Sequence, residues 1–104
     1  MKKINDLNFS ENVIDNNKAV LVEFTADHCA PCQGMARTLD KLAPIYAEHV
    51  DFCSADIFAC NLHASQYRVQ SLPTIIMFVG GVPRGCLTGE QGAKKMRKFI
   101  EETI

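Results

Sequence analysis

The sequence predicts an α/β domain built on a central mixed sheet of four to five strands, with helices on both faces. Strand, helix and strand alternate over residues 20–56, an order that predicts two parallel strands joined by a right-handed crossover. Gly80-Gly81 joins two further apolar segments, and this turn predicts an antiparallel hairpin. The run 75–79 is apolar and mostly β-branched, as expected of a strand covered on both sides.

Apolar periodicity and turn residues set the order of the elements. Phe9 and Ser10 are of the types expected for a hydrophobic residue and an N-cap that open a short first helix. In the long helix, Pro44 removes the backbone bond to Asp40 and should bend the helix there. We expect strands at 3–5, 20–25, 50–56, 75–79 and 84–88, and helices at 10–17, 31–49, 61–67 and 91–103.

Length and composition are those of one globular domain covering residues 1–104. Its hydrophobic content is 47%, and 11 Lys and Arg balance 12 Asp and Glu. This balance favours neither nucleic acid nor an anionic membrane surface as a partner. The run 75–79 is far shorter than the roughly 18 residues of a spanning helix, and no apolar signal segment follows Met1. We therefore expect a monomeric, cytoplasmic protein.

The chain has five cysteines, and this odd number argues against a structural disulfide framework. It favours a reducing compartment, in which thiols stay free. Cys53, Cys60 and Cys86 are expected to be small buried hydrophobic residues. If Cys60 is exposed, it would instead be a candidate for a regulatory disulfide between molecules.

The remaining two cysteines form Cys29-Ala30-Pro31-Cys32, directly after the apolar strand 20–25 and at the start of the long helix. Two thiols at this spacing can interconvert between a dithiol and a disulfide, which predicts redox chemistry. A thiol before a helix faces unpaired backbone N–H groups and the positive end of the helix dipole, so Cys29 is the expected nucleophile.

Activation of the Cys29 thiol alone increases the rate of disulfide exchange only slightly. Lowering a thiol pKa from about 8.5 to about 7 raises the thiolate fraction roughly 15-fold at neutral pH, but the lower nucleophilicity offsets roughly 5-fold of this gain. The second thiol therefore matters more, because Cys32 is held beside any mixed disulfide on Cys29 and can resolve it. Cys32 needs a base, and Glu23 on the preceding strand could accept its proton through a water. The alternative is a glutamate that faces solvent at a strand end.

Three segments carry a resemblance to a known family: 24–32 with its cysteine pair, Leu72-Pro73-Thr74 before an apolar strand, and Gly89 after the last strand. With their spacing, the chain resembles the thioredoxin family over essentially its whole length. The resemblance implies the thioredoxin fold and the reduction of disulfide-containing protein substrates without a bound cofactor. It also implies a thioredoxin reductase as electron donor.

The chain departs from that family pattern around the cysteines. It has no Trp, and His28 and Thr25 stand where tryptophans are usual. Ala30 replaces the usual Gly, Glu23 replaces a buried Asp, and Ser54 stands where many bacterial members have a Lys.

The resemblance also implies a substrate groove. A cis Leu72-Pro73 bond facing the cysteines would hold the Leu72 backbone where an extended substrate segment can pair with it. Otherwise Pro73 is an ordinary proline at the start of a strand. The resemblance implies that small or apolar residues form this groove, namely Ala30, Pro31, Leu72, Pro73 and Gly89. His28 would lie at its edge, as a pH-sensitive or an idle residue.

Three alternatives remain. Cys29, Cys32, Cys60 and His63 have the ligand types of a structural zinc site. The chain could also keep this fold without catalysing a reaction and serve as a partner-binding subunit. Oxidase or isomerase activity is the nearest enzymatic alternative, but the residues between the cysteines lack the His that makes such disulfides more oxidising. We expect a protein-disulfide reductase with no metal site.

Overall fold

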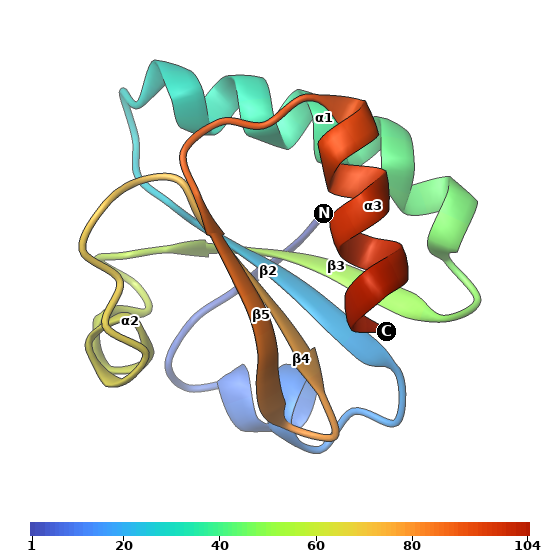
Figure 1. The fold of residues 1–104 in the computed structure, drawn as a ribbon. Helices are drawn as coiled ribbons and strands as arrows, with labels where there is room; N and C mark the ends of the chain where they lie inside the picture. Colours follow the sequence, from blue (N-terminus) through green and yellow to red (C-terminus); the bar gives the residue numbers. More distant parts are fainter.

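The computed structural model describes residues 1–104 and contains one five-stranded sheet with the strand order β1-β3-β2-β4-β5 (Figure 1). The predicted mixed sheet with helices on both faces is confirmed, since β1, β3 and β2 run parallel whereas β4 is antiparallel to both of its neighbours. The strands are β1 (Lys2–Ile4), β2 (Ala19–Thr25), β3 (Val50–Asp56), β4 (Thr74–Val79) and β5 (Val82–Thr88). The helices are η1 (Ser10–Ile14), α1 (Ala30–Tyr46), α2 (Asn61–Gln66) and α3 (Ala93–Thr103).

The core has two layers, one on each face of the sheet. Under α1 and α3, Leu21 of β2 packs with Met35, Leu39 and Ile100. On the other face, η1 and α2 cover a second cluster that includes Phe24 and its strand neighbours Val20 and Val22. Successive side chains of a strand point to opposite faces, so Glu23 points with Leu21 towards α1. The functional carboxyl predicted from the sequence is thereby aimed at the helix that begins with the cysteine pair.

The hairpin between β4 and β5 has the turn that its glycines predict. Gly80 and Gly81 have φ values of +61° and +77°, and both lie in the left-handed region that a two-residue hairpin turn requires. β5 is an edge strand, so it has a neighbouring strand, β4, on one side only. Its residues are mostly exposed.

Several boundaries differ from the sequence-based expectations. The helix α1 passes through Pro44 and ends at Tyr46, three residues before the predicted end. The first helical segment is a single π-helical stretch, and Ser10 makes no N-capping bond. Instead, the Asn5 side chain accepts N–H bonds from Leu7 and Asn8, at 2.9 Å and 3.1 Å. Short Asn side chains commonly bond nearby backbone in this way, and the turn that Asn5 forms lies before the helix, whose N-cap residue is Phe9 and has no side-chain capping bond.

Candidate functional site

The two cysteines of the predicted redox pair form a disulfide at the start of α1, with Cα atoms 5.2 Å apart. Cys29 is the N-cap residue, and its sulfur accepts a bond from the Cys32 backbone N–H at 3.3 Å. Pro31 occupies the first turn, where its missing N–H costs no helical bond. The local sequence therefore builds a helix start whose free N–H groups face the Cys29 sulfur.

Exposure distinguishes the two thiols. Cys29 is half-buried, whereas Cys32 is only 1% exposed. An incoming disulfide can therefore reach the Cys29 sulfur, whereas Cys32 is too deeply buried for a protein disulfide to reach. This difference gives the pair two chemically unequal members.

Glu23 is completely buried, so the alternative of a solvent-facing glutamate is wrong. Neither oxygen of its carboxyl group has a hydrogen-bond partner in the protein. Burial, followed by the negative charge of Asp40, raises the pKa of Glu23 from 4.5 to about 7. A carboxyl group with that pKa exchanges protons readily near neutral pH.

Glu23 and Cys32 both line a solvent-open cavity of about 610 Å³. Lys3 and Ser54 line it too, because they lie in register with each other on neighbouring strands and Ser54 pairs with Glu23. The cavity is large enough to hold water beside the Glu23 carboxyl. Sequence reasoning missed this cavity and the place of Lys3 in it, since both depend on the pairing of β1 with β3.

The sheet pairing brings three chain segments to the same end of the strands. Phe24 of β2 is paired with Thr74 of β4, and Thr74 is paired with Thr88 of β5. The loop to Cys29, the Leu72-Pro73 step and Gly89 therefore all lie at the same end of the strands. This convergence is the one that a groove beside the disulfide requires.

The Leu72-Pro73 peptide bond is cis, as the resemblance implies. Pro73 is buried, Leu72 is half-buried, and β4 begins at the next residue. The carbonyl of Pro73 accepts a bond from the Gly89 backbone N–H at 2.8 Å, and Gly89 has a φ of +83°. A glycine fits this left-handed conformation without strain, so it can hold the two segments together.

The other predicted groove residues surround the disulfide. Ala30 and Pro31 are exposed on the first turn of α1. His28 is exposed, lines the cavity and adopts a left-handed backbone conformation with a φ of +61°. A non-glycine residue rarely adopts such a φ, and it marks a sharp change of direction immediately before Cys29.

The three other cysteines are free, and they differ in exposure. Cys53 and Cys60 are buried, as predicted, and burial, with nearby negative charge, raises their pKa values to about 11 and about 12. Cys86 is exposed, so the prediction that it is buried is wrong. The reason is that it lies on the edge strand β5. Because Cys60 is buried, it does not meet the condition for a disulfide between molecules.

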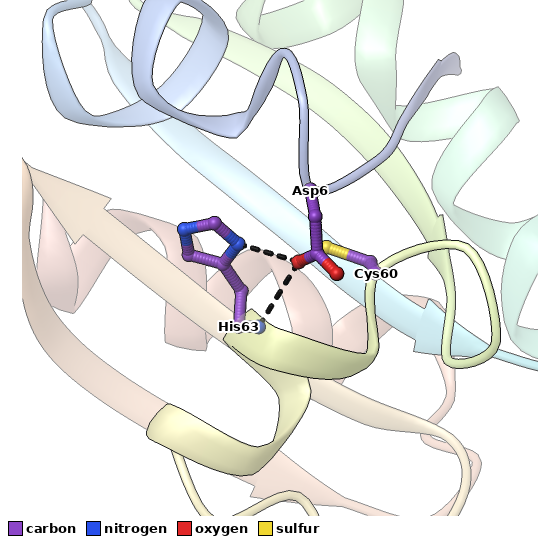
Figure 2. A group of neighbouring side chains, drawn as sticks. All are labelled: Asp6, Cys60 and His63. Atoms are coloured by element: carbon purple, nitrogen blue, oxygen red, sulfur yellow. Dashed lines mark hydrogen bonds and ion pairs between the residues drawn. The ribbon is translucent and has the colours of Figure 1, made fainter.

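The predicted alternative of a zinc site made by Cys29, Cys32, Cys60 and His63 is also wrong. The side chains whose ligand atoms converge are Asp6, Cys60 and His63, and neither residue of the disulfide is among them (Figure 2). Sequence reasoning paired Cys60 with His63 by their spacing but missed Asp6, which comes from a distant loop.

The thioredoxin family model matches residues 1–102. The chain belongs to the thioredoxin family. It is 33% identical to thioredoxin C-2 of Corynebacterium nephridii over 99 residues, which cover 95% of this chain and 92% of that protein. It is 32% identical to the thioredoxin of Alicyclobacillus acidocaldarius over 101 residues, covering 97% and 95% of the two chains. Membership and the Cys29–Cys32 pair identify this thioredoxin-family chain as a thiol–disulfide oxidoreductase of the protein-disulfide reductase type.

A further relative of this thioredoxin-family chain is the bifunctional thioredoxin reductase/thioredoxin of Mycobacterium leprae. The two are 28% identical over 102 residues, which cover 98% of this chain but only 22% of that protein. No helix of the chain is long and apolar enough to cross a bilayer.

Proposed function

We propose that the chain reduces protein disulfides, with Cys29 as the nucleophile and Cys32 as the resolving thiol. The Cys29 thiolate attacks one sulfur of a substrate disulfide, and the other substrate sulfur leaves as a thiolate and takes up a proton. Cys32 then loses its proton and attacks the Cys29 sulfur, which breaks the mixed disulfide and releases the second substrate sulfur as a thiolate that takes up a proton. The products are the reduced substrate and the Cys29–Cys32 disulfide, so two electrons pass to the substrate. The observation that carries this assignment is the half-buried Cys29 beside the fully buried Cys32.

Glu23 is the proposed acceptor of the Cys32 proton. Both residues line the same cavity, and the carboxyl oxygens of Glu23 have no other protein group to bond. A water in the cavity can accept from the thiol and donate to the carboxylate, since the pKa of Glu23, about 7, lets it take up and release the proton. Buried polar groups normally find such a partner.

The substrate groove is proposed to lie between the start of α1 and the Leu72-Pro73 step. Small or apolar residues line it at Ala30, Pro31, Pro73 and Gly89, so few substrate side chains would be excluded. The Leu72 backbone would pair with an extended substrate segment next to the disulfide. His28 is exposed and borders both this groove and the cavity, so its ring is placed to contact a bound substrate segment.

We further propose that one domain, residues 1–104, acts as a monomer in the cytoplasm with a thioredoxin reductase as electron donor. The free thiols of Cys53, Cys60 and Cys86 are typical of a reducing compartment. The fusion of the two activities in the Mycobacterium leprae relative supports the reductase as a partner.

Reduction of insulin disulfides in the presence of dithiothreitol tests the proposed activity. We expect the chain to accelerate the reaction well above dithiothreitol alone, and Cys29→Ser to abolish the acceleration. No acceleration by the intact chain would favour a non-catalytic partner-binding subunit. A reduction potential well above about −200 mV would instead favour an oxidase or isomerase.

A further inference from the structure

A second group of chemically active side chains lies outside the redox site. Asp6 belongs to the loop after β1, whereas Cys60 and His63 lie at the start of α2, and His63 is 57 residues away from Asp6 in sequence. The possible ligand atoms of the three side chains all lie within 4.8 Å of one another. In Figure 2 the Cys60 sulfur and the His63 ring approach the Asp6 carboxylate from two sides.

We propose that Asp6, Cys60 and His63 bind a zinc ion, with a water molecule as the fourth ligand. A thiolate, an imidazole and a carboxylate are the ligand types that zinc accepts in tetrahedral sites. The sulfur and nitrogen donors disfavour magnesium and calcium, which prefer oxygen ligands alone. This proposal is independent of the proposed reductase function.

The spacing of the donor atoms is close to that of a tetrahedral site. With bonds of about 2.0 Å to oxygen and nitrogen and about 2.3 Å to sulfur, tetrahedral donors lie roughly 3.3 to 3.6 Å apart. The Asp6 Oδ1 to His63 Nδ1 distance is 2.6 Å, and no pair exceeds 4.8 Å. Binding therefore needs the Asp6 carboxylate and the His63 ring to separate by roughly 1 Å, and any pair at the 4.8 Å limit to approach by roughly 1.2 Å. Shifts of this size are within the reach of side-chain torsions.

The charges also balance. A thiolate and a carboxylate together neutralise a divalent cation, so the complex places no net charge in this half-buried position. Without the cation, a thiolate at Cys60 would lie buried beside the Asp6 carboxylate, and the thiol form is favoured. Zinc binding therefore displaces the proton of the Cys60 thiol. Nδ1 of His63 carries no proton when it is the ligand, so the ring proton of the complex is on Nε2.

Neighbouring groups orient two of the three ligands before any metal arrives. The Asp6 Oδ2 atom accepts a bond from the Leu62 backbone N–H at 3.0 Å, which holds the carboxylate in place. The His63 ring stacks on Phe9, with ring centroids 4.0 Å apart and an interplanar angle of 16°. Outer contacts of this kind commonly support metal sites. The side chains of Asp6 and His63 are 15% and 19% exposed, whereas Cys60 is fully buried, so the water ligand would approach from the side of Asp6 and His63.

The experiment uses the oxidised protein, because the Cys29–Cys32 disulfide then removes the other thiol pair that could hold zinc. Calorimetric titration with Zn²⁺ should give one ion per chain. Cobalt provides a second probe, since a thiolate ligand gives Co²⁺ an intense charge-transfer absorption band. We expect Cys60→Ser to abolish this band and to weaken zinc binding at least about 100-fold.

Matched controls come from the other free cysteines. Cys86→Ser and Cys53→Ser should bind zinc like the parent protein, and His63→Gln should weaken binding. If Cys60→Ser does not fold, the double variant Cys53→Ser/Cys86→Ser leaves Cys60 as the single thiol of the oxidised protein. The cobalt band in this variant then decides the question without any change to the site.

Two results would overturn the proposal. One is the absence of both zinc binding and the cobalt band in the oxidised protein. The other is binding that survives in folded Cys60→Ser or disappears in Cys86→Ser. Either result would leave the reductase assignment untouched, because the assay does not use the redox reaction.

Discussion

Glu23 on β2 and Cys32 on α1 are both buried, yet both line one solvent-open cavity. A buried thiol that must lose a proton and a buried carboxyl that can gain one thus share a route for water. In the proposed mechanism the second step uses groups that line this cavity, whereas the first step takes place at the more exposed Cys29. Predictions about the two steps can therefore be tested separately.

Replacement of Cys32 by Ser should trap the reaction at its midpoint. Cys29 can still attack a substrate disulfide, but no thiol is held beside the mixed disulfide to release it. We expect turnover to fall at least about 100-fold and a covalent complex to accumulate, as measured by non-reducing electrophoresis and mass spectrometry.

Cys86→Ser is the control for Cys32→Ser, since Cys86 is an exposed cysteine outside the pair. It should retain turnover and form no lasting complex. If Cys32→Ser forms no covalent complex while Cys29 is intact, the assigned order of the two thiols is wrong.

The Glu23→Gln variant should slow the resolution step without affecting the first attack. The amide cannot accept the Cys32 proton, and general bases typically contribute a factor of about 100 or more. Stopped-flow measurement of mixed-disulfide resolution should lose the inflection near pH 7 that the Glu23 pKa predicts. An unchanged pH profile would remove Glu23 from the mechanism.

Glu48→Gln makes the same chemical change at an exposed position and serves as its control. It should leave both the rate and the profile of resolution unchanged. An equal effect of both variants would indicate a general effect of the lost charge rather than proton transfer at Glu23.

Glu23 should also make the protein less stable as the pH rises. Its pKa is about 7 in the folded state and 4.5 in the reference state, so between these values the unfolded chain has lost a proton that the folded chain retains. The free energy of unfolding therefore falls from about pH 4.5 to about pH 7 and stays lower above it. The cavity screens part of the charge, so we expect a loss of about 2 to 3 kcal/mol.

Urea denaturation of the oxidised protein at several pH values measures this effect. Glu23→Gln should remove most of the decrease and be more stable than the parent above pH 7. A parent protein whose stability is constant or increases over this window would contradict the raised pKa.

Gly85 should be difficult to replace, because β5 approaches α3 closely at this residue. An added Cβ would lie 2.8 Å from Thr103 Cγ2 and 2.9 Å from the Phe99 ring. These contacts are too short, so Gly85→Ala should destabilise the protein by about 1 to 3 kcal/mol. Thermal unfolding by circular dichroism measures the loss.

The matched substitution is Gly92→Ala, where an added Cβ would meet no atom within 4 Å. Gly92 is the N-cap residue of α3, where Ala is less favourable than Gly, so we expect this variant to lose no more than about 1 kcal/mol. If both alanine variants unfold at the parent temperature, the packing of β5 against α3 is looser than described.

Local sequence patterns predicted much of this fold. The strand at 50–56 matches β3 at both ends, and the glycine pair at 80–81 forms the predicted turn. These features depend on side-chain alternation and backbone preference over a few residues. The start of the first helix differs from the prediction, because Ser10 lies inside the helix and Phe9, which has no side-chain capping bond, is the N-cap residue.

The sequence by itself determined the redox pair, since two thiols at that spacing before a helix need no distant partner. It also identified Glu23 as a candidate base, but only the tertiary structure shows that this carboxyl is buried and lines the same cavity as Cys32. The exposure of Cys86 and the meeting of Asp6 with Cys60 and His63 were decided in the same way. The physical reason is that burial and convergence depend on strand order and register, which bring together side chains far apart along the chain.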